Sequence, residues 1–114
     1  MTAEGIEELA AQGFPVYPGA LGENVTTRGL DHRSLRLGQR YRIAGVAIEL
    51  SEIRVPCSTL NVYGKGIQAA MYDAQTQAGD PVSPRWGLSG FYASVVCTGT
   101  IQTGDPISLA DESC

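Results

Sequence analysis

The chain has 114 residues, of which 43% are hydrophobic and 18% are charged, and its formal net charge at pH 7 is −4. This length suits one domain with a modest core, and the composition excludes a disordered chain. The acidic balance argues against a nucleic-acid surface, which needs clustered Lys and Arg. The closest basic group has two interpretations, a solvated edge or an anion-binding strip; it consists of Arg33, Arg36, Arg40 and Arg42.

The sequence shows no sign of a membrane segment or of a secretory leader. No apolar run approaches the ~18 to 20 residues that a membrane span requires, and the acidic first 13 residues do not have the layout of a signal peptide. We therefore expect a cytoplasmic protein, in which thiols stay reduced. The three cysteines are odd in number and widely spaced, and there is one histidine and no CxxC, so the sequence predicts neither a disulfide framework nor a zinc site.

The first 30 residues predict one helix followed by loops. Residues 2–12 have Ile6, Leu9 and Ala10 at helical spacing, with Thr2 or Gly5 near the start and Gly13 as the stop. Two prolines and three glycines make residues 13–24 a loop, and residues 24–30 are a candidate short strand.

A strongly alternating segment follows, from residue 34 to residue 55. Apolar residues recur at every second position between Gly38 and Gly45 and again beyond Gly45, which is typical of half-buried antiparallel strands. A tight turn at Ala44-Gly45 predicts a hairpin between residues 40–43 and 46–53.

The last third of the chain predicts short elements. Residues 58–63 suit one helical turn, and residues 66–79 suit a second short helix with Ile67, Ala70 and Met71 on one side. Residues 80–90 are loop. Two strands close the chain, the first over residues 91–96 and including Ile101, the second over residues 106–109; the last four residues are expected to fray. The pattern as a whole predicts a mainly β domain with two or three short helices.

Cys57 is the candidate reactive residue. It follows Pro56 at a strand-to-turn transition, with Arg54 three residues earlier, and nearby positive charge lowers the pKa of a thiol and so favours the reactive thiolate. A structural, buried cysteine is the alternative interpretation. Cys97 lies in the apolar stretch "ASVVC" and suits a core or strand-end position, and Cys114 belongs to the tail.

Two other residues that often carry function have simpler interpretations here. His32 is the only histidine, and beside Asp31 and Arg33 it is expected to be a surface residue in a polar turn rather than a catalytic base. Trp86 is expected to pack over a loop rather than to stack on a ligand.

Three separated segments resemble one protein family. "PGALGENVTTRGLD", "LRLGQRYRIAGVAIELSEIRVPCSTLN" and "PRWGLSGFYASVVCTGTIQTGDPISL" occur in this order, and together they are similar to the C-terminal domain of molybdenum cofactor sulfurases, the MOSC family. The resemblance covers about residues 13–109 and includes an Arg-x-Pro-Cys element. It implies a single MOSC-like domain over residues 1–114 with a β-rich, barrel-like fold.

The resemblance also implies the site. Cys57 matches the position that carries sulfur or coordinates molybdenum, which makes it the expected catalytic residue and a candidate molybdenum ligand. Asn24, in the Gly-Glu-Asn element, matches a position expected near the molybdenum cofactor (molybdopterin), and Thr26 and Arg54 are weaker matches to cofactor-binding positions. A soft thiolate suits molybdenum or a persulfide, and an arginine suits the cofactor's anionic groups.

The sequence departs from the family pattern at its N-terminal side, and this departure predicts a homodimer. Family members have a further N-terminal stretch before the Gly-Glu-Asn element, and here only a short helix precedes it, so we expect a domain that is incomplete as a monomer. A barrel that lacks strands exposes edges and apolar surface, which a homodimer would cover.

Two hypotheses for the function follow from the resemblance. In the first, the domain binds molybdenum cofactor or carries sulfur on Cys57, and a separate redox or sulfur-donor protein serves it, because no flavin, iron–sulfur or haem motif is visible. In the second, the chain is a non-catalytic, dimeric small-ligand-binding or interaction module derived from a shortened MOSC domain. Neither hypothesis includes a membrane or a nucleic acid as partner.

Overall fold

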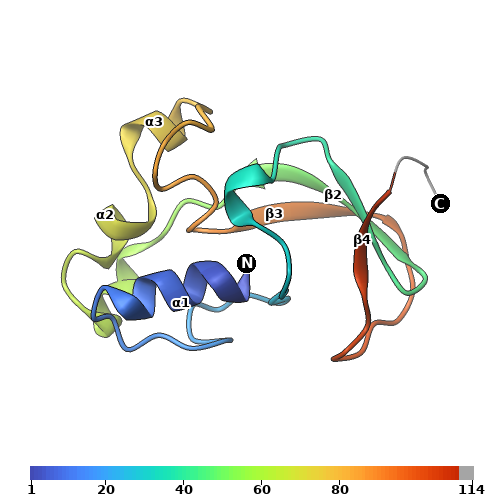
Figure 1. Ribbon diagram of the computed structural model, residues 1–114, viewed down its shortest axis with the longest axis horizontal. Coiled ribbons are helices and arrows are strands. Elements are labelled where there is room, and N and C mark those ends of the chain that lie inside the picture. Colours follow the sequence, from blue (N-terminus) through green and yellow to red (C-terminus); the bar gives the residue numbers. More distant parts are fainter. Residues whose placement is uncertain (111–114) are drawn as a thin grey trace. The chain divides into compact units, whose positions relative to one another are not determined.

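The computed structural model describes residues 1–110, and the chain forms two compact units. The first comprises Met1–Leu35 and Ile53–Gly90, and the second comprises Arg36–Glu52 and Phe91–Cys114, of which residues 91–110 are described. The first unit holds the helices and the second holds the sheet (Figure 1). None of the helices within residues 1–110 combines the length and the apolar character that crossing a bilayer demands.

Helix α1, Ala3–Ala11, confirms the helix expected over residues 2–12. Thr2 is its N-cap, and the Thr2 side chain accepts a hydrogen bond from the Gly5 backbone N–H at 3.0 Å, which satisfies one of the free donors of the first turn. Gly13 follows the helix with a φ of +102°, a left-handed conformation that glycine adopts at low cost and that ends the helix.

The strand expected over residues 24–30 is reduced to one bridge. Thr27 pairs in parallel with Thr2: the Ala3 N–H donates to the Thr27 carbonyl at 2.6 Å, and the Thr27 N–H donates to the Met1 carbonyl at 2.9 Å. This bridge ties the start of α1 to the segment that carries Asn24 and Thr26.

The middle of the first unit consists of short helices. The 3-10 helix η2, Ser58–Tyr63, confirms the turn expected there, whereas the helix expected over residues 66–79 is two helices, α2 at Ile67–Met71 and α3 at Ala74–Gln77. The chain is extended at Tyr72, and the Asp73 carboxylate accepts from the Thr76 N–H at 2.7 Å and so caps a new helix. A further 3-10 turn, η1, spans His32–Ser34.

The core of the first unit gathers residues from α1, the following loop, η2, α2 and the segment before Gly90. Its buried members are Ile6, Leu9, Val16, Leu21, Leu60, Ile67, Met71 and Leu88. Ile67 and Met71 lie on the buried side of α2, as the helical spacing predicted, and Ala70 is partly buried beside them.

The hairpin expected in the second unit is confirmed to the residue. Strand β1, Arg40–Ile43, pairs antiparallel with β2, Val46–Ile53, in the register Ile43↔Val46 and Arg40↔Glu49. Ala44 in the turn takes a φ of +51°, a conformation that costs a non-glycine residue roughly 1 to 2 kcal/mol and that the twist of a two-residue hairpin requires.

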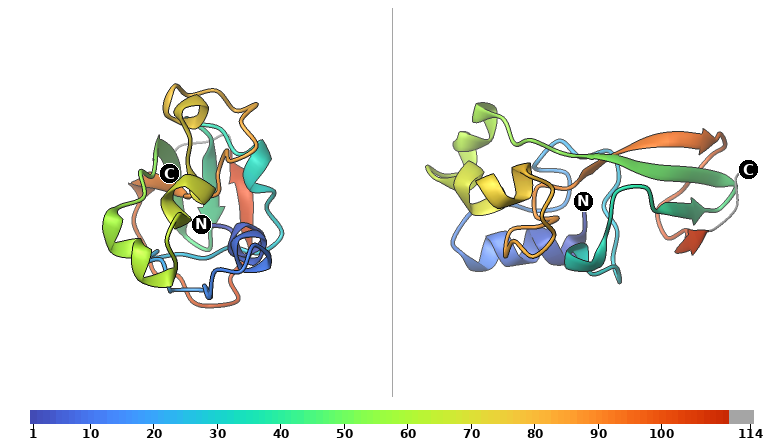
Figure 2. Two further views of the ribbon diagram at one scale, coloured as in Figure 1. Left: turned by 90° about the vertical axis from the view of Figure 1, so that its left-hand side faces the viewer. Right: turned by 90° about the horizontal axis from the view of Figure 1, so that it is seen from above.

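The two C-terminal strands lie along opposite edges of this hairpin. Strand β3, Phe91–Cys97, lies beside β2, and β4, Ile107–Ala110, pairs antiparallel with β1, so that the sheet order is β3-β2-β1-β4 (Figures 1 and 2). Ile101, which was expected in a strand, lies outside the strands in an exposed connection.

The fold is therefore less β-rich than expected. The described residues form a mixed α/β domain with three short α-helices and a four-stranded sheet. The two outer strands, β3 and β4, do not pair with each other, so the sheet is not closed into a barrel. The described residues hold two 3-10 helices beside the three α-helices, so there are more helical elements than the two or three expected, and the expected barrel is not formed. The expectation of an incomplete monomer stays a prediction.

A core substitution in α1 tests the packing of the first unit. Leu9 is fully buried, and Leu9→Ala removes its methyl groups and leaves a cavity, so we expect the free energy of unfolding to fall by roughly 2 to 5 kcal/mol. Val62 in η2 is 80% exposed, and Val62→Ala is the matched control, with an expected change within about 0.5 kcal/mol. Urea unfolding followed by circular dichroism measures both; equal effects would contradict the assigned core.

Candidate functional site

Cys57 is an exposed thiol at the start of η2. Its sulfur lies 2.7 Å from the Thr59 hydroxyl oxygen, and its extended backbone makes it the N-cap of the 3-10 helix. The preceding Pro56 is buried, and its carbonyl accepts a hydrogen bond from the Gln68 side chain at 3.1 Å. Cys57 forms no disulfide and is exposed, and its exposure makes the alternative of a buried structural cysteine wrong.

The surroundings of the sulfur favour the thiolate. The Thr59 hydroxyl lowers the pKa of the Cys57 thiol below its ordinary value, and the Thr59 backbone N–H lowers it further. The positive charge of Arg54 was expected to lower this pKa, but the groups that lower it are hydrogen-bond partners in the turn itself. The hydroxyl two residues after the cysteine is the signal that sequence reasoning missed.

The Arg54 side chain is engaged elsewhere in the first unit. Its guanidinium donates to the Leu21 carbonyl and approaches the Met1 sulfur at 3.6 Å, while its backbone N–H donates to the Gly90 carbonyl at 3.0 Å. Arg54 therefore ties three separate stretches of the first unit together, and its charge lies against the loop that leads into the Gly-Glu-Asn element.

The other two expected cofactor residues lie in that element and just beyond it. Thr26 donates its hydroxyl proton to the Glu23 carboxylate at 3.0 Å and is partly buried. Asn24 is exposed. The structure thus brings Arg54 to the loop that precedes Asn24 and Thr26, whereas the contacts of Cys57 lie within its own turn. Within residues 1–110 no cluster of three or more His, Cys, Asp or Glu side chains has the arrangement to hold a metal ion.

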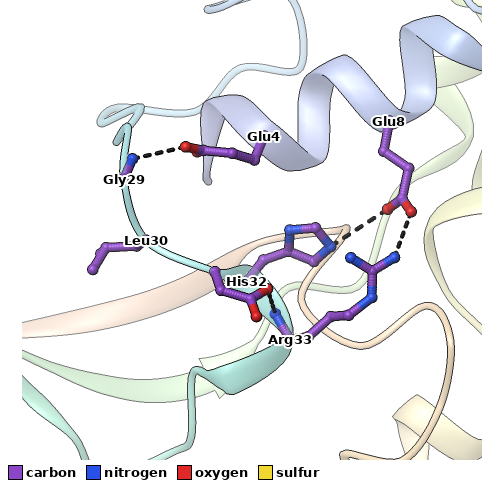
Figure 3. A pocket seen from close by; sticks show the side chains of 7 residues that line it. Glu4, Glu8, Gly29, Leu30, His32 and Arg33 are labelled. Atoms are coloured by element: carbon purple, nitrogen blue, oxygen red, sulfur yellow. Dashed lines mark hydrogen bonds and ion pairs between the residues drawn. The ribbon is translucent and has the colours of Figure 1, made fainter.

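His32 is buried, contrary to the surface position expected for it. It is 2% exposed, and its ring lies between the N-terminus of α1 and Glu8 (Figure 3). Nδ1 is 3.4 Å from the Thr2 hydroxyl oxygen, and Nε2 is 3.4 Å from the Glu8 carboxylate. Thr2 already accepts from the Gly5 N–H, so its hydroxyl proton is free to donate to Nδ1, and the neutral ring then carries its proton on Nε2.

A shallow cavity of about 360 Å³ adjoins this histidine, lined mainly by α1 and the segment around η1 (Figure 3). The lining residues are Glu4, Glu8, Gly29, Leu30, Asp31, His32 and Arg33. Glu4 accepts from the Gly29 N–H at 2.7 Å, and Glu8 pairs with Arg33. The acidic groups of α1 therefore hold the η1 segment against the helix, and sequence reasoning did not find this cluster.

Burial lowers the pKa of His32, and the neighbouring positive charge of Arg33 lowers it further, against the opposing effects of Glu8 and Asp31. The folded state therefore favours the neutral ring more than the unfolded chain does. The resulting stability is fully present above the ordinary pKa of 6.5 and is lost as the pH falls toward the lower folded-state pKa.

The structure also tests the predictions for Trp86 and Cys97. Trp86 is 2% exposed and donates its indole N–H to the Leu35 carbonyl at 2.7 Å, which confirms its packing role. Cys97 is disulfide-bonded, so the expectation of a chain without disulfides is wrong for this residue. Cys114 lies outside the described residues.

The chain belongs to the MOSC domain family, which matches residues 1–108. The match begins at the first residue, so α1 is part of the family domain, although the resemblance in the sequence covered only residues 13–109. The boundary of a single domain at residues 1–114 stays a prediction.

Three solved structures are similar in fold. YiiM from Geobacillus stearothermophilus is 31% identical with a TM-score of 0.69, and YuaD from Bacillus subtilis is 31% identical with a TM-score of 0.66. YiiM from Escherichia coli, at 24% identity and a TM-score of 0.68, shares the fold. The matches cover 96%, 94% and 97% of this chain and 52%, 59% and 52% of those chains, respectively.

A curated relative is much longer than this chain. A protein named "Reductase" from Gibberella moniliformis is 33% identical over 94 residues, which are 82% of this chain and 15% of the relative. The chain thus spans a small part of this relative and just over half of the solved structures.

The buried histidine makes stability depend on pH in a definable range. Between pH 7.5 and 5.5 we expect the melting temperature of the protein to fall, because the unfolded chain binds a proton at His32 more readily than the folded one. His32→Gln, which does not titrate, should be less stable at pH 7.5 but should lose less melting temperature over the same range. Parallel thermal melts measure this difference, and equal losses in both proteins would contradict the assignment.

Proposed function

We propose that this MOSC-family chain carries sulfur on Cys57. The observation that supports the proposal most directly is the exposed free thiol whose sulfur lies 2.7 Å from the Thr59 hydroxyl, in a turn that lowers its pKa. Thiolate character and access are the two properties that make a cysteine a sulfur acceptor.

The sulfur transfer is an exchange between two sulfur atoms. The Cys57 thiolate attacks the outer sulfur of a persulfide on a donor, and a new S–S bond forms at Cys57. The donor's S–S bond breaks, and its electron pair leaves on the donor's inner sulfur as a thiolate. The outer sulfur keeps its proton, so there is no net oxidation and no further reactant. The donor, a thiol protein or a low-molecular-weight persulfide, is a separate molecule.

Molybdenum cofactor is the family-implied ligand, and the residues fit it in part. Cys57 fits, because a thiolate is a soft ligand that suits molybdenum. Asn24 is exposed, whereas Arg54 and Thr26 already have partners in the Leu21 carbonyl and the Glu23 carboxylate. When bound, the cofactor would supply a redox-active metal. A reductive role, which the name of the Gibberella moniliformis relative suggests, would need a separate electron donor.

Cys57→Ser tests the sulfur-carrier function, since it keeps the size and the polar contact of the side chain but not the thiol. We expect the wild-type protein to gain the mass of one sulfur atom after incubation with glutathione persulfide, and the variant to gain none. Intact-mass spectrometry without reductant measures this, and elemental analysis for molybdenum on protein from cells that make the cofactor tests ligation by Cys57. Equal sulfur uptake by both proteins, or uptake by neither, would contradict the proposed role.

A second candidate function, a dimeric interaction module, is favoured by exposed apolar side chains of the second unit. Tyr92 and Val95 of β3 are 53% and 61% exposed, and Leu109 of β4 is 60% exposed. These two strands are the outer strands of the sheet, and an unpaired strand edge is a liability that pairing with another chain removes. We propose a second copy of this chain as the partner that covers them.

The dimer predicts a solution mass near twice the 12.1 kDa of the chain. Val95→Lys, which places a charge on the exposed strand, should shift the protein to the monomeric mass in size-exclusion chromatography with light scattering. Val82, which is 79% exposed in a loop of the first unit, gives the control Val82→Lys, for which the dimeric mass should persist. A wild-type protein that is monomeric at high micromolar concentration would overturn the dimer.

A further inference from the structure

We propose that the shallow cavity beside His32 binds a small free amine in its charged, primary ammonium form. The lining residues all belong to the first unit, and the volume of about 360 Å³ suits a small ligand. Three lining side chains, Glu4, Glu8 and His32, each have one polar atom in contact with a partner and one buried polar atom without a hydrogen-bond partner among residues 1–110 (Figure 3). The inference goes beyond the proposed sulfur-carrier function and does not involve Cys57.

The two glutamates present unused acceptors to the cavity. Glu4 and Glu8 lie one helical turn apart on the same side of α1. One oxygen of Glu4 accepts from the Gly29 N–H at 2.7 Å, and one oxygen of Glu8 accepts from the Arg33 guanidinium. The second oxygen of each carboxylate is buried and has no hydrogen-bond partner within the described part of the chain. Leaving a buried carboxylate oxygen without a donor is costly, so a ligand that donates to both oxygens would stabilise the folded protein.

His32 indicates a missing partner independently of the two carboxylates. Its side chain is 3% exposed and lines the cavity, with the ring between α1 and Glu8 (Figure 3). Nδ1 contacts the Thr2 hydroxyl, whereas the 3.4 Å contact of Nε2 with Glu8 does not have hydrogen-bond geometry, so that Nε2 has no hydrogen-bond partner among residues 1–110. A buried ring nitrogen without a partner, beside a cavity of this size, points to a polar ligand.

The charges of the lining favour a cation with several N–H donors. Glu4, Glu8 and Asp31 provide three carboxylates against the one guanidinium of Arg33, and burial lowers the pKa of His32, so the ring is neutral at pH 7.5. Hydrogen bonds from an ammonium to a carboxylate belong to the strong, charge-assisted class. A metal ion suits the cavity less, because among residues 1–110 no group of three or more His, Cys, Asp or Glu side chains has the arrangement to hold one.

The imidazole can supply a third acceptor. The Thr2 hydroxyl oxygen uses one lone pair for the Gly5 N–H at 3.0 Å, and its second lone pair can accept from Nδ1–H of His32. In that tautomer Nε2 is an acceptor. A primary ammonium has three donors, which equals in number the two carboxylate oxygens and Nε2. We therefore expect ligand binding to move the imidazole proton from Nε2 to Nδ1.

The single histidine allows a direct test, because the ring signals in nuclear magnetic resonance report on this cavity alone. The probes are butylammonium and tetramethylammonium, which are isomers of the same charge, and only the first has N–H donors. At pH 7.5 and constant ionic strength in sodium chloride, we expect butylammonium to shift the ring nitrogen signals saturably and to transfer the protonated position from Nε2 to Nδ1. Tetramethylammonium should cause no saturable shift.

A pair of matched variants locates the binding. In Glu4→Gln the amide oxygen can still accept from the Gly29 N–H, while the amide nitrogen replaces the unused acceptor by a donor, so butylammonium should bind roughly tenfold or more weakly. Glu7→Gln removes the same charge from the same helix. Because Glu7 is exposed, pairs with Arg28 and does not line the cavity, this control should keep the wild-type affinity within about twofold.

The comparison of probes on the wild-type protein decides the proposal even if a variant fails to fold. Equal responses to the two isomers, or no saturable response to butylammonium, would overturn the site. An equal response to potassium chloride would mean that any monovalent cation suffices and would overturn the ammonium as ligand. Tighter binding of Nα-acetyl-lysine amide than of butylammonium would assign the ammonium to a protein side chain and contradict a free amine. Transfer of the ring proton by butylammonium alone supports the proposal.

Discussion

The burial of Leu60 is the constraint on which the candidate site depends. This side chain belongs to the core that α1, η2 and α2 share, and it lies three residues after Cys57. Because the core holds Leu60, the short η2 helix has a fixed orientation, and the sulfur of Cys57 and the hydroxyl of Thr59 meet on its exposed side. An exposed cysteine on an unanchored loop would lose this contact to side-chain and backbone entropy.

The Arg54 side chain stabilises the fold and does not contact the Cys57 sulfur. Its guanidinium and backbone connect Met1, Leu21 and Gly90, so it stabilises the packing of three stretches that are distant in sequence. The thiolate character of Cys57 therefore comes from hydrogen bonds in its own turn, which act over shorter distances than a charge and are less sensitive to salt. His32 is a second titratable group that serves the fold, because its contacts with Thr2 and Glu8 hold η1 against α1.

The sequence predicted those parts of the fold that local chemistry controls. The hairpin of β1 and β2 was located to the residue because the alternation of apolar and polar residues and the two-residue turn fix the same pairing register. Helix α1 was located because Thr2 and Gly13 mark its ends. The split between α2 and α3 was missed because an aspartate within a helical pattern does not by itself predict a cap. The Asp73 carboxylate interrupts the helix here because it accepts a hydrogen bond from the Thr76 N–H. The burial of His32 was missed because polar neighbours in sequence conceal a contact with a helix 24 residues earlier.

The sequence by itself determined the family, the reactive cysteine as a candidate and the elements that depend on neighbours a few residues apart. Only the tertiary structure decided that β4 pairs with β1, that Arg54 turns toward Leu21, and that Thr59 rather than Arg54 faces the sulfur. The physical reason is that periodicity and turn chemistry are local properties of the chain. Strand order, burial and the direction of a long side chain depend on which distant segments meet, and sequence spacing carries little information about that.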